Sequence, residues 1–190
     1  ETSSQVDKKA VQERDESIIQ PVMVVIIAIL LLVYLRSIPA TIYLVGTVLI
    51  SFFAALGLGC LVLTTFFGAE SIASALPLYS FVFLIALGED YNIFMISEVW
   101  NNRKTQSLKD AVKNGVTQTG SVITSAGLIL AGTFAVLATL PIQLLVQFGV
   151  ITAIGVLIDT FIVRPLLVPA ITVVLGRFAF WPGKLFKKED

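Results

Sequence analysis

Five stretches of the sequence are almost continuously apolar, and each is long enough to cross a membrane as an α-helix. They occupy residues 18–35, 41–67, 76–97, 116–140 and 144–163. The last pattern continues through two prolines towards residue 175. A bilayer core about 30 Å thick requires about 20 apolar residues per helix, whereas barrel strands are about half as long and alternate in polarity. The pattern therefore predicts an all-α membrane protein with five transmembrane helices over residues 18–175.

A polar stretch between the third and fourth apolar runs contains a further helical pattern. Ser107 is a typical helix N-cap residue, and in residues 108–113 the apolar and charged side chains fall on opposite sides of a helix. The pattern predicts a short cytoplasmic helix on the membrane surface. A solvated connecting turn fits the same residues equally well.

Basic residues fall in alternate loops, and this predicts the orientation in the membrane. Arg36 follows the first run, four basic residues lie within 103–113, and five follow residue 163, whereas 68–75 and the turn at Pro141 contain none. Short loops rich in Lys and Arg stay in the cytoplasm. We therefore expect a cytoplasmic C-terminus and, after five crossings, an N-terminus outside.

The polar residues 1–17 precede the first apolar run and contain no apolar core of a signal peptide. An upstream segment must then have exported them, so we expect the chain to be a fragment of a longer protein. The expected organisation is the end of an extracytoplasmic segment at 1–17, a transmembrane domain at 18–175 and a cytoplasmic tail at 176–190.

Composition excludes several classes of function. Of 190 residues, 56% are hydrophobic and 14% charged, against about 45–50% and about 25% in soluble domains. Thirteen basic and thirteen acidic residues cancel, so nucleic acid is not an expected partner. The chain has no histidine and only Cys60. We expect no metal site, no cofactor and, without a nucleophile and base pair, no enzyme.

The strongest chemical signal is GEDYN at residues 88–92, inside the third apolar run. Counted from Leu78 at about 1.5 Å per residue, Asp90 lies about 18 Å along the helix, near the middle of the membrane. An aspartate at that depth costs about 3 kcal/mol even on a lenient scale, so such groups face a bundle interior or a water-filled path. Burial favours the neutral carboxyl, which can load a proton from one side and release it to the other. A buried pair kept only for helix association is the alternative.

The two acids point in different directions, because adjacent helical residues differ by about 100°. Asp90 shares a face with Leu87 and Phe94, and we expect it to titrate in a proton relay. Glu89 lies among aliphatic residues and is predicted to be a second carboxyl or modulator, protonated unless it reaches water. Tyr91 is expected to form a hydrogen bond with a carboxyl on a partner helix.

Helix four is the expected partner of this relay. Gly120, Gly127 and other small residues recur along one side and allow close packing. The hydroxyl of Thr124 or Ser125 is therefore placed to reach the carboxyl of Asp90. Plain close packing is the simpler interpretation for either hydroxyl alone.

Helix five carries one more acid, Asp159, about 7 Å from the predicted inner end near Arg164. We expect Asp159 either to support the relay or to orient the helices, with water or Arg103 satisfying its charge. Arg164 is expected to extend towards lipid head groups.

With these residues in place, the sequence resembles the resistance-nodulation-division superfamily of proton-driven exporters, and within it the MmpL branch of bacterial membrane proteins. The matching segments are GEDYN at 88–92, LKDAV at 108–112, TSAGLILAGTFAVLA at 124–138 and FGVITAIGVLIDTFIVRPLLVPA at 148–170, followed by Gly176 and Trp181-Pro182. Together they span most of residues 18–182.

The resemblance implies that the five helices follow the extracytoplasmic domain within one six-helix half of a twelve-helix transporter. In the family, the Asp-Tyr pairs of the two halves meet at a pseudo-twofold axis and form the proton relay, and Asp90 and Tyr91 match that pair. The resemblance also implies that Leu87 and Phe94 line the adjoining pocket. The position of Glu89 is more often small or apolar, so the extra acid is expected to change proton stoichiometry or affinity.

The predicted function is the transmembrane part of an exporter of lipids or other amphiphilic molecules, driven by the proton-motive force across a bacterial cell membrane. Expected partners are membrane lipids, protons, the substrate, and either the other half of the transporter or a second copy of the chain. The alternative is a lipid sensor, because sterol-sensing domains share this five-helix unit but act by binding. A purely structural half of an assembly is a third interpretation.

Overall fold

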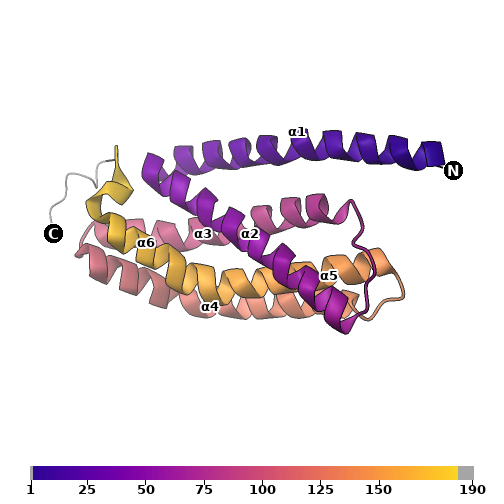
Figure 1. The fold of residues 1–190 in the computed structure, drawn as a ribbon. Helices are drawn as coiled ribbons and strands as arrows, with labels where there is room; N and C mark the ends of the chain where they lie inside the picture. The colour runs from indigo at the N-terminus through magenta and orange to yellow at the C-terminus, as the bar shows by residue number, and fades with distance from the viewer. Residues whose placement is uncertain (1, 184–190) are drawn as a thin grey trace.

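The computed structural model describes the backbone of residues 2–183 and the side chains of residues 14 and 17–183. Helices joined by short loops make up this part of the chain (Figure 1). In chain order they are α1 Thr2–Leu35, α2 Ile38–Phe66, α3 Leu76–Arg103, α4 Leu108–Leu137, α5 Gln143–Ile158, the π-helix η1 Asp159–Leu167, α6 Val168–Leu175 and the 3-10 helix η2 Gly176–Phe180.

The prediction of five transmembrane helices is confirmed. Five helical segments of the described chain are long and apolar enough to cross a membrane, namely Ser17–Leu35, Ile38–Phe66, Leu76–Arg103, Leu108–Leu137 and Gln143–Phe180. The fifth segment combines α5, η1, α6 and η2, so it runs well beyond the inner end that we predicted near Arg164.

The separate surface helix predicted after Ser107 is wrong. Ser107 does cap a helix, since its Oγ accepts a hydrogen bond of 3.3 Å from the backbone N–H of Asp110. That helix is α4, which continues without a break from Leu108 to Leu137. Residues 108–113 form its first turns. The helix continues through Asn114-Gly115, a common turn pair, where α4 packs so closely on α3 that a Cβ at Gly115 would lie 2.7 Å from Val99.

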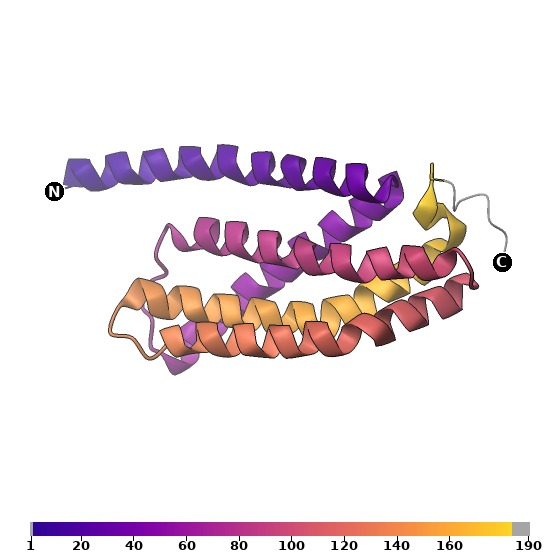
Figure 2. The same cartoon turned by 180° about the vertical axis from the view of Figure 1, so that it is seen from behind.

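Helices α3, α4 and α5 lie side by side, and α2 crosses them obliquely (Figures 1 and 2). Helix α4 packs along both α3 and α5, while α1 contacts α2 and α3. Close packing between α5 and its neighbours depends on Gly155. A Cβ atom there would lie 2.7 Å from the Cδ atoms of Leu84 and 3.0 Å from the Cβ of Ala55, closer than ordinary contact allows.

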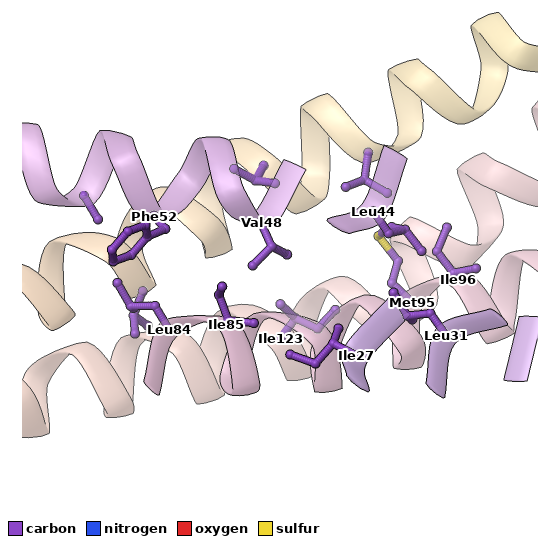
Figure 3. Packing of buried hydrophobic residues seen from close by; sticks show 14 of the residues in the cluster. Ile27, Leu31, Leu44, Val48, Phe52, Leu84, Ile85, Met95, Ile96 and Ile123 are labelled. Atoms are coloured by element: carbon purple, nitrogen blue, oxygen red, sulfur yellow. The ribbon is translucent and has the colours of Figure 1, made fainter. Parts of the chain in front are cut away.

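The main apolar core lies between α1, α2 and α3 (Figure 3). Its side chains interdigitate from all three helices. Helix α4 adds Ile123 and Ala131, and α5, η1 and α6 add Val156, Val163 and Val168. Those labelled in the figure are Ile27, Leu31, Leu44, Val48, Phe52, Leu84, Ile85, Met95, Ile96 and Ile123.

Hydrogen bonds hold the connecting segments in place at both ends of the bundle. At one end the C-terminal segment packs onto the α1–α2 turn, where Ser37 Oγ donates to the carbonyl of Ala179 at 2.6 Å and the N–H of Ile38 donates to the carbonyl of Trp181 at 3.1 Å. At the other end Gln147 ties down the α2–α3 loop by hydrogen bonds to Ser71 and Ala73. The N-terminus of α1 and the C-terminal segment lie at opposite ends (Figure 1), as an odd number of crossings requires.

Candidate functional site

Four polar side chains lie inside the bundle, midway along α3 and at η1, and we call them the inner cluster. Glu89 and Asn92 come from α3 and are 5% and 0% exposed, while Asp159 and Arg164 come from η1 and are 7% and 2% exposed. Ionisable side chains are almost never buried to this extent unless they are paired. Burying the inner cluster therefore carries a high cost in free energy of desolvation.

The π-helix η1 brings Asp159 and Arg164 together. In a regular α-helix, residues five apart point about 140° away from each other, whereas i→i+5 hydrogen bonding stacks them on one side. Pro165 lies within this segment, and proline lacks the backbone N–H that an α-helix needs. The guanidinium of Arg164 donates through Nη2 to Oδ2 of Asp159 and lies 3.5 Å from the carbonyl oxygen of Gly88.

This pairing corrects two expectations about the fifth helix. Arg164 does not extend to lipid head groups. The helical segment continues beyond it through α6 to Leu175, which leaves the guanidinium inside the bundle. Arg103 is not the partner of Asp159, since Arg103 donates to the carbonyl of Gln106 at 3.2 Å and Asp159 pairs with Arg164.

Tyr91 joins α3 to the η1 part of the inner cluster. The guanidinium carbon of Arg164 lies 4.2 Å from the centroid of the Tyr91 ring, in a cation–π contact. Tyr91 and Leu87 also line a cavity of about 10 Å³, whose wall includes Asp159 and Arg164. That volume is close to the minimum that one water molecule needs.

Glu89 is buried beside the side-chain amide of Asn92, one turn further along α3. Within the described residues, neither side chain makes a hydrogen bond of ordinary length and angle. A Cβ at the adjacent Gly88 would lie 3.3 Å from Val48 of α2 and in ordinary contact, 3.8 Å, with Oδ2 of Asp159, so η1 lies directly against α3 here. Glu89 therefore shares the interior with Asp159 and Arg164 rather than with aliphatic side chains alone.

Asp90 lies on the opposite side of α3 from this interior and is exposed. Its expected neighbour Phe94 is exposed on the same side, whereas Leu87 is half-buried in the wall of the 10 Å³ cavity. The expectation that the bundle itself would shield Asp90 is therefore not met, and Glu89 occupies the interior instead. We call the exposed surface around Asp90 and Phe94 the outer face of α3.

At Gly127, helix α4 contacts η1 rather than Asp90. A Cβ at Gly127 would collide with the side chain of Thr160. Thr124, Thr160 and Arg164 line a second cavity, of about 30 Å³, while Ser125 is exposed. In the described part of the chain no hydrogen bond joins Thr124 or Ser125 to Asp90, and their part in a relay stays a prediction.

Sequence reasoning did not find the Asp159–Arg164 pair or the buried Asn92. The signal for the pair was Pro165 directly after Arg164 in an apolar pattern that continues to residue 175. A helix that continues past an arginine places that arginine inside the membrane, where it needs an acidic partner.

Comparison with known proteins gives one consistent group of relatives. Residues 2–189 match the MMPL family. The chain is 74% identical over 190 residues to an apo-petrobactin exporter of Bacillus anthracis, an alignment that covers 100% of this chain and 26% of the relative.

Two further relatives are more distant. The putative membrane protein ActII-3 of Streptomyces coelicolor is 43% identical over 184 residues, covering 97% of this chain and 26% of the relative. The acyltrehalose exporter MmpL10 of Mycobacterium tuberculosis is 41% identical over 171 residues, covering 90% of this chain and 17% of the relative. The chain thus spans about a quarter or less of the length of these relatives.

Proposed function

Because the chain belongs to the MMPL family, we propose that it forms the transmembrane part of an exporter driven by the proton-motive force. Two of the relatives are named as exporters of apo-petrobactin and of acyltrehalose. For this chain we propose the export of lipids or other amphiphilic molecules across a bacterial membrane.

The proton relay in this proposal consists of Asp90 and Tyr91, and the observation that carries it is the position of Asp90. A carboxyl exposed near the middle of a transmembrane helix cannot remain charged against lipid at acceptable cost. A second protein surface must therefore cover the outer face of α3, either the other half of the transporter or a second copy of the chain. Protonation of Asp90 then removes a charge from that interface.

The contact between Tyr91 and Arg164 supports a route by which this change reaches the rest of the bundle. Tyr91 follows Asp90 directly on α3, and its ring stacks on the guanidinium that η1 carries. A shift or rotation of α3 on protonation of Asp90 moves the Tyr91 ring and biases η1. Thr124 and Asp159 support the relay through the cavities beside Arg164, and Ser125 on the surface of α4 is the alternative to Thr124 as the supporting hydroxyl.

The proposed orientation has the N-terminus outside and the C-terminus in the cytoplasm. Arg36, Arg103 and Arg177 lie at the end of the bundle where the C-terminal segment packs, and the loops at the opposite end contain no Lys or Arg. Short basic loops are retained in the cytoplasm. Residues 1–17 then form the end of an extracytoplasmic segment, 18–175 the membrane domain and 176–190 the cytoplasmic tail.

The test compares export by three proteins in inverted membrane vesicles. Asp90→Asn should abolish export while leaving membrane insertion and accumulation unchanged, because asparagine keeps the shape but cannot take up the proton. Glu98→Gln, two turns further along α3, is the matched control and should export normally. A protonophore should stop export by the unaltered protein. Export by Asp90→Asn at the normal rate would reject the relay.

A lipid sensor is the second candidate, and an apolar hollow of about 620 Å³ favours it. The hollow opens between α1, α3 and α5, with Tyr79, Phe83 and Phe148 in its wall, and its size suits an acyl chain or a sterol. A sensor would keep its lipid response after the protonophore and in the Asp90→Asn variant, whereas an exporter would lose its activity in both.

A further inference from the structure

We propose that Glu89 and Asp159 hold one exchangeable proton between them beside Arg164, as a second proton-binding site inside this half, separate from Asp90. This inference rests on the proposed function only for the use of that proton in export. The existence of the site follows from the contacts and charges of the inner cluster.

The first argument is the balance of buried charge. The inner cluster contains two carboxyls, Glu89 and Asp159, and one guanidinium, Arg164, all at most 7% exposed. With both carboxyls ionised, the cluster would hold an unbalanced negative charge in a low-dielectric interior, which is strongly unfavourable. Binding one proton makes the cluster neutral.

No other charged group supplies the balance. The ionisable groups that face Glu89 are Asp159 and Arg164 from η1, with Asp90 and Tyr91 beside it on α3. Helices α2 and α5 and the membrane span of α1 contain no Asp, Glu, Lys or Arg, and those of α4 all lie within residues 109–113, in its first turns. The cluster must therefore be neutralised by a proton.

The second argument locates the proton. Asp159 accepts a hydrogen bond from Arg164 and forms an ion pair with it. Of the two carboxyls, Asp159 is therefore the better able to stay ionised. Glu89 has the neutral amide of Asn92 beside it, one turn along the same helix, and neither makes a hydrogen bond of ordinary geometry among the described residues. A protonated Glu89 is neutral and needs no countercharge, so the resting proton sits on Glu89.

The third argument is access. Two small cavities flank Arg164. The one of about 10 Å³ is lined by Ser51, Tyr91 and Asp159 among others. The one of about 30 Å³ is lined by threonine hydroxyls, including those of Thr119 and Thr124. Each is close to or above the minimum volume that one water molecule needs. Water in the smaller cavity can carry a proton to and from Asp159, which shares it with Glu89.

The experiment is an infrared pH titration of the protein in lipid nanodiscs, because the C=O stretch of a protonated carboxyl is separate from the bands of a carboxylate. Because Asp90 has a carboxyl of its own that can be protonated, all spectra are taken from protein that carries Asp90→Asn. This protein should show a buried protonated carboxyl at neutral pH. Adding Glu89→Gln should remove that band, whereas adding the matched control Glu98→Gln should leave it in place.

Asp159→Asn tests whether the proton is shared. When Asp159 cannot carry charge, Glu89 becomes the only counterion for Arg164 and should ionise, so the band should disappear although Glu89 is intact. A carboxyl that is protonated merely because it is buried would keep its band in Asp159→Asn, and that result overturns the sharing.

Persistence of the band when Glu89→Gln is added to the Asp90→Asn protein, or its absence from the Asp90→Asn protein at neutral pH, overturns the site itself. Glutamine and asparagine preserve side-chain shape, and co-elution of each variant with the unaltered protein on size-exclusion chromatography verifies folding. The spectra do not depend on export. Failure of the Asp90 relay in the vesicle assay therefore leaves this result standing, and a missing Glu89 band leaves the relay standing.

Discussion

Glu89 and Asp90 are neighbours in the chain but lie in opposite surroundings. Glu89 belongs to the inner cluster, where η1 supplies a guanidinium and an acid at close range. Asp90 lies on the outer face of α3, where the described chain supplies nothing to cover it. One bound proton neutralises the inner cluster without a second protein surface, whereas Asp90 requires such a surface.

This difference teaches which functions each region can perform alone. A buried site that becomes neutral when it binds one proton can hold that proton within one half of a transporter. A carboxyl on an uncovered face can respond only to what packs against it, and so it is suited to sense or drive movement between halves. The following substitutions separate the two regions, from the largest expected effect to the smallest.

Breaking the inner cluster should have the largest effect on stability. Arg164→Leu leaves two buried carboxyls without a cation, and loss of one partner of a buried ion pair costs about 3 kcal/mol or more. The fraction of protein that stays soluble after heating in detergent should fall sharply. Asp90→Asn, the matched change on the outer face, should not alter it, and an equal loss in both variants would contradict the comparison.

Packing around the site should come next. Gly155→Ala places a Cβ 2.7 Å from Leu84 and 3.0 Å from Ala55, and overpacking of this kind costs about 1–3 kcal/mol. Gly132→Ala on α4 is the control, because no atom lies within 4 Å of its Cβ position. Thermal stability in detergent should fall for Gly155→Ala and hold or rise for Gly132→Ala. Equal stability of the two would show that α5 does not depend on close contact at Gly155.

Tyr91 connects the two regions, and two substitutions divide its roles. Tyr91→Leu removes the ring from Arg164 and should cost about 0.5–2 kcal/mol of stability. Tyr91→Phe keeps the ring but removes the hydroxyl, so it should keep stability while export falls. If Tyr91→Phe exported normally, the hydroxyl would have no part in proton transfer and only the stacking contact would matter.

The smallest effects are expected on α4. Thr124→Val removes a hydroxyl from the 30 Å³ cavity beside Arg164 and should slow export by a few-fold without changing accumulation. Ser125→Ala alters an exposed position and should have no effect if the outer face acts only through Asp90. The measurement is the initial rate of export in vesicles. A larger loss for Ser125→Ala than for Thr124→Val would place the supporting hydroxyl on the exposed surface of α4 instead.

The sequence by itself determined the five transmembrane helices, because runs of about 20 apolar residues leave no other stable conformation in a bilayer. It also predicted a site at GEDYN, since two acids inside an apolar helix are energetically costly wherever they point. The N-cap at Ser107 was equally readable, because capping depends on residues within one turn.

Only the tertiary structure decided which acid is inside. Periodicity places Glu89 and Asp90 about 100° apart, but it does not say which direction faces the bundle. That direction is set by the packing of α2, α4 and α5 against α3. The Asp159–Arg164 pair was hidden for a similar reason. Regular α-helical geometry separates residues five apart, and only the π-helix at Pro165 brings these two onto one side, where burial makes each the counterion of the other.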